Sequence, residues 1–250
     1  MNCMTNLVRI SFAVFIIFLL TACSPKLQLV DAEGFVGEIE GKRTGLYTLK
    51  SSKLAMQVTN FGGRVVSLFV PDRDGNYVDV VLGHNTLEEY LNPQRERFLG
   101  AVVGPYANRI SGGAYTYEGQ TYELSKNHSG KSTLHGGFKG LDSVVWDVVD
   151  VTDTSICLHY LHADGTEGFP GNLHIDMTYS LGNDLWRIEY RAYTDKVRPV
   201  SISNHPYFNL SGEGNGTCHD YVLYVDADKF VGTVGLEVLE ELLPYIDAMN

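Results

Sequence analysis

Short apolar runs rich in β-branched and aromatic residues, separated by glycine-containing turns, fill most of the chain between residues 54 and 192. Runs of this length, bounded by Gly, Pro, Asn and Asp, predict β-strands. Gly62-Gly63 separates the first two runs, and Pro71-Asp-Arg-Asp-Gly75 closes the second. Residues 118–120 and 182–184 predict tight turns between later pairs. The predicted strands are residues 54–61, 64–70, 114–117, 121–124, 144–151, 155–161, 173–181 and 185–192.

This many strands with almost no helical period predicts an all-β fold, a large antiparallel sandwich or a barrel. The exception comes at the end of the chain. Leu236, Leu239 and Leu243 follow helical spacing, with glutamates between them and Pro244 as a stop. Residues 235–243 are therefore expected to form a short helix. The sequence contains no internal repeat and no low-complexity segment.

The first residues have the layout of an export signal, Met1–Ala22, and are set apart from the fold. Arg9 precedes an apolar run over residues 10–20 that is short for a membrane-spanning helix. Leu20-Thr-Ala-Cys23 then resembles the bacterial lipobox, in which the cysteine is acylated and becomes the new N-terminus. We expect a lipoprotein anchored at Cys23, and Ser24 is compatible with the periplasmic side of the outer membrane. The alternative is an ordinary signal peptide that happens to end before a cysteine.

The remaining chain is expected to form one domain. Residues 23–41 are polar and acidic without periodicity, which predicts a tether between lipid and domain. Residues 42–230 carry the β pattern and are enough for one substantial core. Residues 231–250 depart from that pattern and are expected to form a divergent tail.

Charge and cysteine content narrow the possible partners. The formal net charge is −11, which argues against a nucleic-acid partner, because binding to phosphates needs a basic surface. The same charge disfavours an anionic substrate. Of four cysteines, Cys3 lies in the signal and Cys23 is the lipidation candidate. Cys157 and Cys218 remain, and they can pair in an oxidising compartment, but their spacing matches no motif.

Three polar segments are the candidates for chemistry. Gly104-Pro-Tyr-Ala-Asn-Arg-Ile110 contains Asn108 and Arg109, Thr133-Leu-His-Gly-Gly137 contains His135, and Ser203-Asn-His-Pro-Tyr-Phe-Asn-Leu210 contains His205. Taken singly, a lone arginine is more often a solvated charge, and a histidine beside two glycines is more often a turn residue. Together they offer what a sugar site needs: aromatic walls, amides and guanidinium for hydroxyls, and a group that titrates near neutrality.

In this order, the three segments closely resemble the aldose 1-epimerase family. Family members carry segments of the forms N-R-I, L-H-G-G and N-H-x-Y-F-N-L around one sugar pocket. The resemblance extends from about Gly45 to Phe230 and implies a large antiparallel β-sandwich. Further matching segments are Asn60-Phe-Gly-Gly-Arg64, Ser67-Leu68, Val80-Val-Leu-Gly83, Tyr90, Gly165-Thr-Glu-Gly-Phe-Pro-Gly171 and Asp226-Ala-Asp228.

The resemblance also implies roles. His205 matches the general acid that protonates the ring oxygen of a pyranose, and His135 matches a second histidine near that oxygen. Asn108 and Arg109 match residues that hold sugar hydroxyls. A base removes the anomeric proton, the ring opens, the C1–C2 bond rotates, and closure gives the other anomer of an aldose such as galactose or glucose. This chemistry needs no cofactor and no metal.

One departure from the family leaves alternatives open. The family's base is a glutamate near the C-terminus, and an aspartate and a glutamine that hold the sugar precede it. Residues 231–250 do not resemble that segment of the family. Glu237, Glu240 and Glu241 fit the solvated face of a helix better. A truncated or frameshifted reading frame is expected, which leaves a catalytically dead remnant or weak sugar-binding protein as the alternative to an epimerase. A related hexose-6-phosphate epimerase is a lesser alternative, because it would need basic residues around the phosphate.

Overall fold

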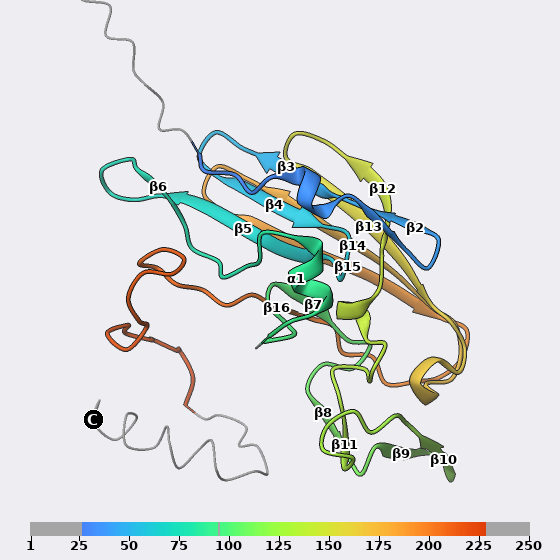
Figure 1. The fold of residues 1–250 in the computed structure, drawn as a ribbon. Coiled ribbons are helices and arrows are strands. Elements are labelled where there is room, and N and C mark those ends of the chain that lie inside the picture. Colours follow the sequence, from blue (N-terminus) through green and yellow to red (C-terminus); the bar gives the residue numbers. More distant parts are fainter. Residues whose placement is uncertain (1–26, 95, 229–250) are drawn as a thin grey trace, which may run out of the picture. The chain divides into compact units, whose positions relative to one another are not determined.

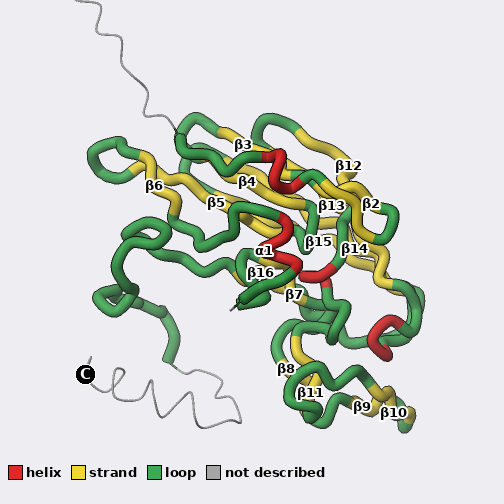
Figure 2. The backbone as a smooth tube through the Cα atoms, viewed as in Figure 1, coloured by secondary structure: helices red, strands yellow, loops and turns green. Residues whose placement is uncertain are grey.

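The computed structural model describes residues 27–94 and 96–228 (Figure 1). Its contacts divide the chain after Gly216 into two units. Within the described residues, strands dominate, and the helices are one short α-helix and three 3-10 turns (Figure 2). The strands are β1 (Gly37–Ile39), β2 (Lys42–Thr44), β3 (Leu46–Lys50), β4 (Ala55–Thr59), β5 (Arg64–Pro71), β6 (Tyr77–Asp79), β7 (Ala101–Val103), β8 (Arg109–Ser111), β9 (Ala114–Tyr117), β10 (Gln120–Glu123), β11 (Ser132–Leu134), β12 (Asp147–Val151), β13 (Ser155–His162), β14 (Leu173–Leu181), β15 (Trp186–Thr194) and β16 (Ser203–His205). The helices are α1 (Leu87–Leu91), η1 (Ala32–Phe35), η2 (Leu141–Ser143) and η3 (Thr166–Gly168).

Two four-stranded antiparallel sheets, β3-β4-β5-β6 and β12-β13-β14-β15, form the body of the first unit (Figure 1). Their facing sides share one core, to which β4 contributes Met56 and Val58 and β14 contributes Ile175 and Met177. Burial alternates along all nine residues of β14, as expected when one face of a strand packs on a core. The expected all-β sandwich is confirmed.

The expected strands agree with the observed ones to within a few residues at each end. The largest difference is the run 144–151, of which only β12 (Asp147–Val151) forms ladder pairs. The predicted helix 235–243, the tail 231–250, the signal Met1–Ala22 and Cys23 lie outside the described residues. Among the residues that are described, no helix has the length and apolar character needed to cross a bilayer.

The tether expected over residues 23–41 is described from residue 27 onward, and there the structure differs from the expectation. Phe35, in η1, is completely buried and packs against Tyr90 of α1 with ring centroids 6.1 Å apart. The backbone of Val30 exchanges two hydrogen bonds with the side chain of Gln57 on β4, at 2.8 and 2.9 Å. This segment therefore covers the outer face of the first sheet. Its few apolar residues have no helical or strand period, so their packing could not be predicted from the pattern of apolar and polar residues.

The second unit is described only over residues 217–228, which contain no helix or strand. Val222, Leu223, Tyr224 and Val225 are all strongly exposed, with 62–89% of their surface accessible. Cys218 of this unit and Cys157 of the first unit are both free thiols.

Candidate functional site

His205 is positioned by the short ladder between β16 and β7. Within it, His205 lies opposite Ala101, and its carbonyl accepts the amide proton of Gly100 at 3.1 Å. Strand β7 is completely buried, and Val102 donates to the carbonyl of Gly62 at 2.9 Å. The histidine thus sits on a strand that is tied to the first sheet.

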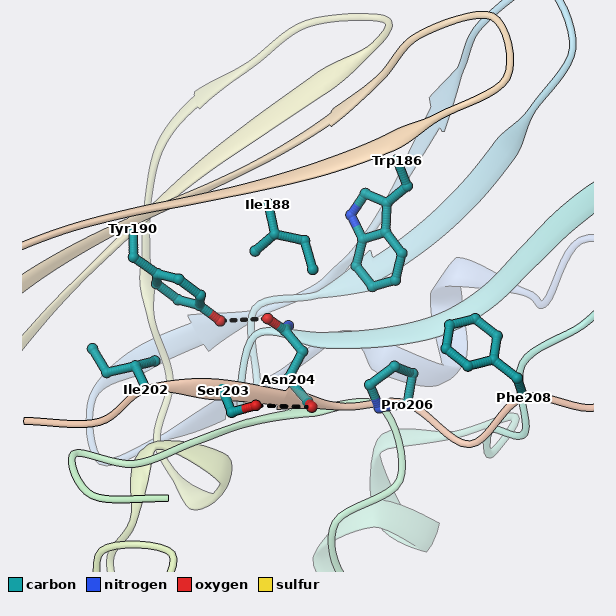
Figure 3. Close-up of a pocket in the computed structure, with 8 residues that line it drawn as sticks. All are labelled: Trp186, Ile188, Tyr190, Ile202, Ser203, Asn204, Pro206 and Phe208. Atoms are coloured by element: carbon teal, nitrogen blue, oxygen red, sulfur yellow. Dashed lines mark hydrogen bonds between the residues drawn. The ribbon is translucent and has the colours of Figure 1, made fainter. Parts of the chain in front are cut away.

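Asn204 ties the same strand to the second sheet. Its Oδ1 accepts the hydroxyl proton of Tyr190 at 2.6 Å, as Figure 3 shows. Its Nδ2 donates to the hydroxyl oxygen of Tyr179, and that hydroxyl donates to the carbonyl of Gly63 at 2.9 Å. Burial raises the pKa of both tyrosines, so the hydroxyls stay protonated.

A pocket of about 440 Å³ lies on this side of β16 (Figure 3). Its walls are mostly apolar and come from β15 and from the 202–208 segment. Neither His135 nor His205 lines it, so it is separate from the site that the sequence predicts. The lining residues are Trp186, Ile188, Tyr190, Ile202, Ser203, Asn204, Pro206 and Phe208.

His135 is positioned by the ladder between β8 and β11, which ends at the Arg109–Leu134 pair. Beyond that pair, the amide of His135 donates to the carbonyl of Asn108, and the amide of Asn108 donates to Nδ1 of His135, both at 3.0 Å. Both residues have positive φ, 52° and 65°. Gly136 follows at φ 92°, with the Gly104 carbonyl where a side chain would lie. Only glycine fits there.

The hydrogen bond from Asn108 fixes the protonation of His135. Because Nδ1 accepts a backbone N–H, the neutral ring carries its proton on Nε2 and presents it as a donor. Burial, followed by the charges of His205 and Arg109, lowers the pKa of His135 to about 4. His135 is therefore a neutral hydrogen-bond donor at physiological pH.

The two histidines meet edge to face, with ring centroids 5.3 Å apart and planes at 84°. The ring of Phe98 contacts both, at 4.7 Å from His135 and 5.7 Å from His205. Tyr207 lies 5.1 Å from His205. The arrangement combines two proton-bearing rings with an aromatic wall, and both histidines are only half-buried, so a ligand can reach them.

Asn108 and Arg109 are exposed beside this pair. Nη1 of Arg109 donates to Oδ1 of Asn108 at 3.2 Å, and Nη2 lies 3.5 Å from Nε2 of His128. The structure thus brings together all four predicted site residues from three separate segments. Phe98, Glu96 and His128 were not predicted. Nothing in the local sequence distinguishes Glu96 from the nearby glutamates of α1.

No group of three or more His, Cys, Asp or Glu side chains suited to holding a metal ion occurs in the part of the chain that the structure describes. The polar groups around the histidine pair include amide, guanidinium and imidazole, with the carboxylate of Glu96 and the hydroxyl of Tyr207 nearby. Such a set can bind hydroxyl groups and exchange a proton with an oxygen atom.

Comparison with known proteins identifies the family. The sequence profile named Aldose 1-epimerase matches residues 45–246. The chain belongs to the aldose 1-epimerase family. Galactose mutarotase from Sus scrofa is 39% identical over 198 residues, which cover 79% of this chain and 55% of that protein. Aldose 1-epimerase from Escherichia coli is 36% identical over 194 residues, 77% of this chain and 55% of that protein. The chain thus spans about half the length of these relatives.

Solved structures of the aldose 1-epimerase family agree with this fold. An aldose epimerase homologue from C. elegans superposes with a TM-score of 0.63 at 30% identity, covering 68% of this chain and 52% of that one. Galactose 1-epimerase from Lactobacillus acidophilus gives a TM-score of 0.61 at 28% identity, covering 70% and 52%. The residues matched by the family profile include Asn108, Arg109, His135 and His205.

Proposed function

We propose that the histidine pair serves an aldose 1-epimerase reaction on an aldose such as galactose or glucose. The observation that carries the proposal is the contact between His135 and His205, 5.3 Å apart, with His135 neutral and its Nε2–H free to donate once Nδ1 is engaged. In the proposed mechanism His205 donates a proton to the ring oxygen of the pyranose, and His135 donates a hydrogen bond near the same oxygen.

The other residues of the site hold the sugar. Arg109 and Asn108 present a guanidinium and an amide at the open side of the pair, where sugar hydroxyls bind. Phe98 supplies an aromatic wall. Removal of the anomeric proton by a base, ring opening, rotation about C1–C2 and closure complete the exchange of anomers. The acid alone contributes a factor of about 100 to 10,000.

Polarimetry of α-galactose tests the proposal. It is run on this chain and on the same chain extended by the C-terminal portion of a relative, since the chain spans half of that length. His205→Ala should lower the saturable rate about 100-fold or more, and His135→Ala should lower it less. His174→Ala, on the outer face of β14, is the matched control. Turnover unchanged by His205→Ala would remove the pair from the mechanism, and galactose binding without turnover in either chain would favour a sugar-binding protein.

We propose further that the protein is an exported lipoprotein anchored through Cys23, facing the periplasm at the outer membrane. The support is the sequence Leu20-Thr-Ala-Cys23 after an apolar run. Several acyl chains on one cysteine give stable membrane attachment. Cys23→Ser should move the protein from the membrane pellet to the soluble fraction and remove the lipid mass from its N-terminal peptide. A wild-type protein without that mass would refute the proposal.

A further inference from the structure

Glu96 lies two residues before Phe98, in the segment that leads into β7. Its Oε1 accepts the backbone N–H of Phe98 at 2.8 Å. The side chain is half-buried and its charge acts on His135, whose pKa it raises against the larger lowering by burial. Glu96 therefore sits at the edge of the histidine pair, although neither family motif nor periodicity points to it.

The same carboxylate acts on the hydroxyl of Tyr207, two residues after His205. Burial, and then hydrogen bonding to Glu96 and its negative charge, raise the pKa of Tyr207 to about 12. Tyr207 therefore keeps its proton at physiological pH. The carboxylate of Glu96 thus acts both on the segment that carries Phe98 and on the segment that carries His205 and Tyr207.

The aromatic rings of these two segments are the ones that contact the histidines. Phe98 touches both imidazoles, and Tyr207 touches His205 at 5.1 Å. On its other side, the 97–99 backbone is held by Arg64, whose Nη1 donates to the carbonyls of Arg97 and Leu99 at 3.0 and 2.9 Å. The segment is thus fixed to the core by Arg64, and within it Glu96 holds the backbone of Phe98.

We propose that Glu96 is a positioning residue of this site, which fixes the ring of Phe98 through its hydrogen bond to the Phe98 amide and orients the ring of Tyr207 through the attraction between its carboxylate and the Tyr207 hydroxyl. It touches neither reacting atom. Its effect on turnover rests on the function proposed above, whereas its effect on the geometry of the two imidazoles does not.

The geometric part is tested by NMR of the histidine side chains in the full chain, without sugar. Ring currents from Phe98 and Tyr207 make the Cε1–H and Cδ2–H resonances of His135 and His205 sensitive to ring placement. Glu96→Ala and Tyr207→Phe should shift these resonances, whereas Glu96→Gln, which keeps an acceptor oxygen, should largely restore them. Glu189→Gln removes the same charge on the outer face of β15 and should change nothing at the pair.

Turnover gives the second readout. Glu96→Ala should lower kcat about tenfold to a hundredfold with little change in KM, because small displacements of catalytic groups slow the chemical step. If Glu96→Ala unfolds, Tyr207→Phe carries the same test. Histidine resonances that move no more in Glu96→Ala and Tyr207→Phe than in Glu189→Gln would overturn the proposal. A wild-type chain without mutarotase activity would count against the proposed function alone, since the resonances still report on Glu96.

Discussion

Asn204→Ala is the substitution that should most directly loosen the strand carrying His205. In the native protein Asn204, on β16, bonds to two tyrosine hydroxyls of the second sheet, that of Tyr179 and that of Tyr190, of which Figure 3 shows the latter. The alanine leaves the Tyr190 hydroxyl without its acceptor at 2.6 Å, whereas the Tyr179 hydroxyl keeps the carbonyl of Gly63. Leaving one buried hydroxyl without a hydrogen-bond partner lowers the free energy of unfolding by about 1–3 kcal/mol. With the lost bond to Tyr179, we expect the free energy of unfolding to fall by about 2–3 kcal/mol.

Urea unfolding followed by circular dichroism measures this change. Tyr190→Phe removes the hydroxyl itself, so the double variant should be less destabilised than the sum of the two single variants, by about 1 kcal/mol or more. Asn183→Ala, in the exposed turn between β14 and β15, is the matched control. If the effects of Asn204→Ala and Tyr190→Phe add to within about 0.5 kcal/mol, the two side chains are not coupled and the reasoning fails.

Three further predictions concern burial and charge. Phe35→Ala should lower the free energy of unfolding by about 3–5 kcal/mol in urea titrations, because the ring is fully buried, whereas a mobile tether would give no change. Burial raises the pKa of Asp79 to about 6, so the folded state binds the extra proton and stability is lost as pH rises from about 4 through 6. Asp79→Asn keeps the acceptor oxygen but cannot ionise. The unfolding free energy of the variant minus that of wild type should therefore increase by about 1–3 kcal/mol as pH rises from about 4 to 6. Burial, then the charge of Arg198, lowers the pKa of His162 to about 4, so the unfolded state binds more protons and stability falls as pH drops from about 6.5 to 4. His162→Gln should flatten that fall, and parallel curves for variant and wild type would contradict the assignment.

The sandwich was predictable because its long strands carry their own pattern. β14 alternates apolar and polar residues over its whole length, and the turns on either side contain glycine. The four predicted site residues were found through resemblance to family motifs. Their meeting in space depends on two separate ladders, β7–β16 and β8–β11, which no single segment specifies.

What the sequence did not predict depends on contacts between distant segments. Phe35 lies in an acidic stretch, and it packs because α1 and the first sheet bring a cluster of apolar residues, Tyr90 among them, against it. α1 itself is short, and its capping box between Thr86 and Glu89 was not recognised. The role proposed for Glu96 depends on its interaction with Tyr207, which lies more than a hundred residues later in the chain.

The side chains of residues 203–208 have two different surroundings: the ring of His205 contacts those of Phe98 and Tyr207, whereas Asn204, Pro206 and Phe208 line the apolar pocket. Successive residues of an extended chain point to opposite sides, so inserting or deleting one residue exchanges the two sets. A single substitution here changes the contacts of one side chain, whereas a change in length would bury the imidazole among Trp186 and Ile188 and turn the apolar side chains toward solvent. In evolution, the length of this segment should therefore be more tightly constrained than its composition.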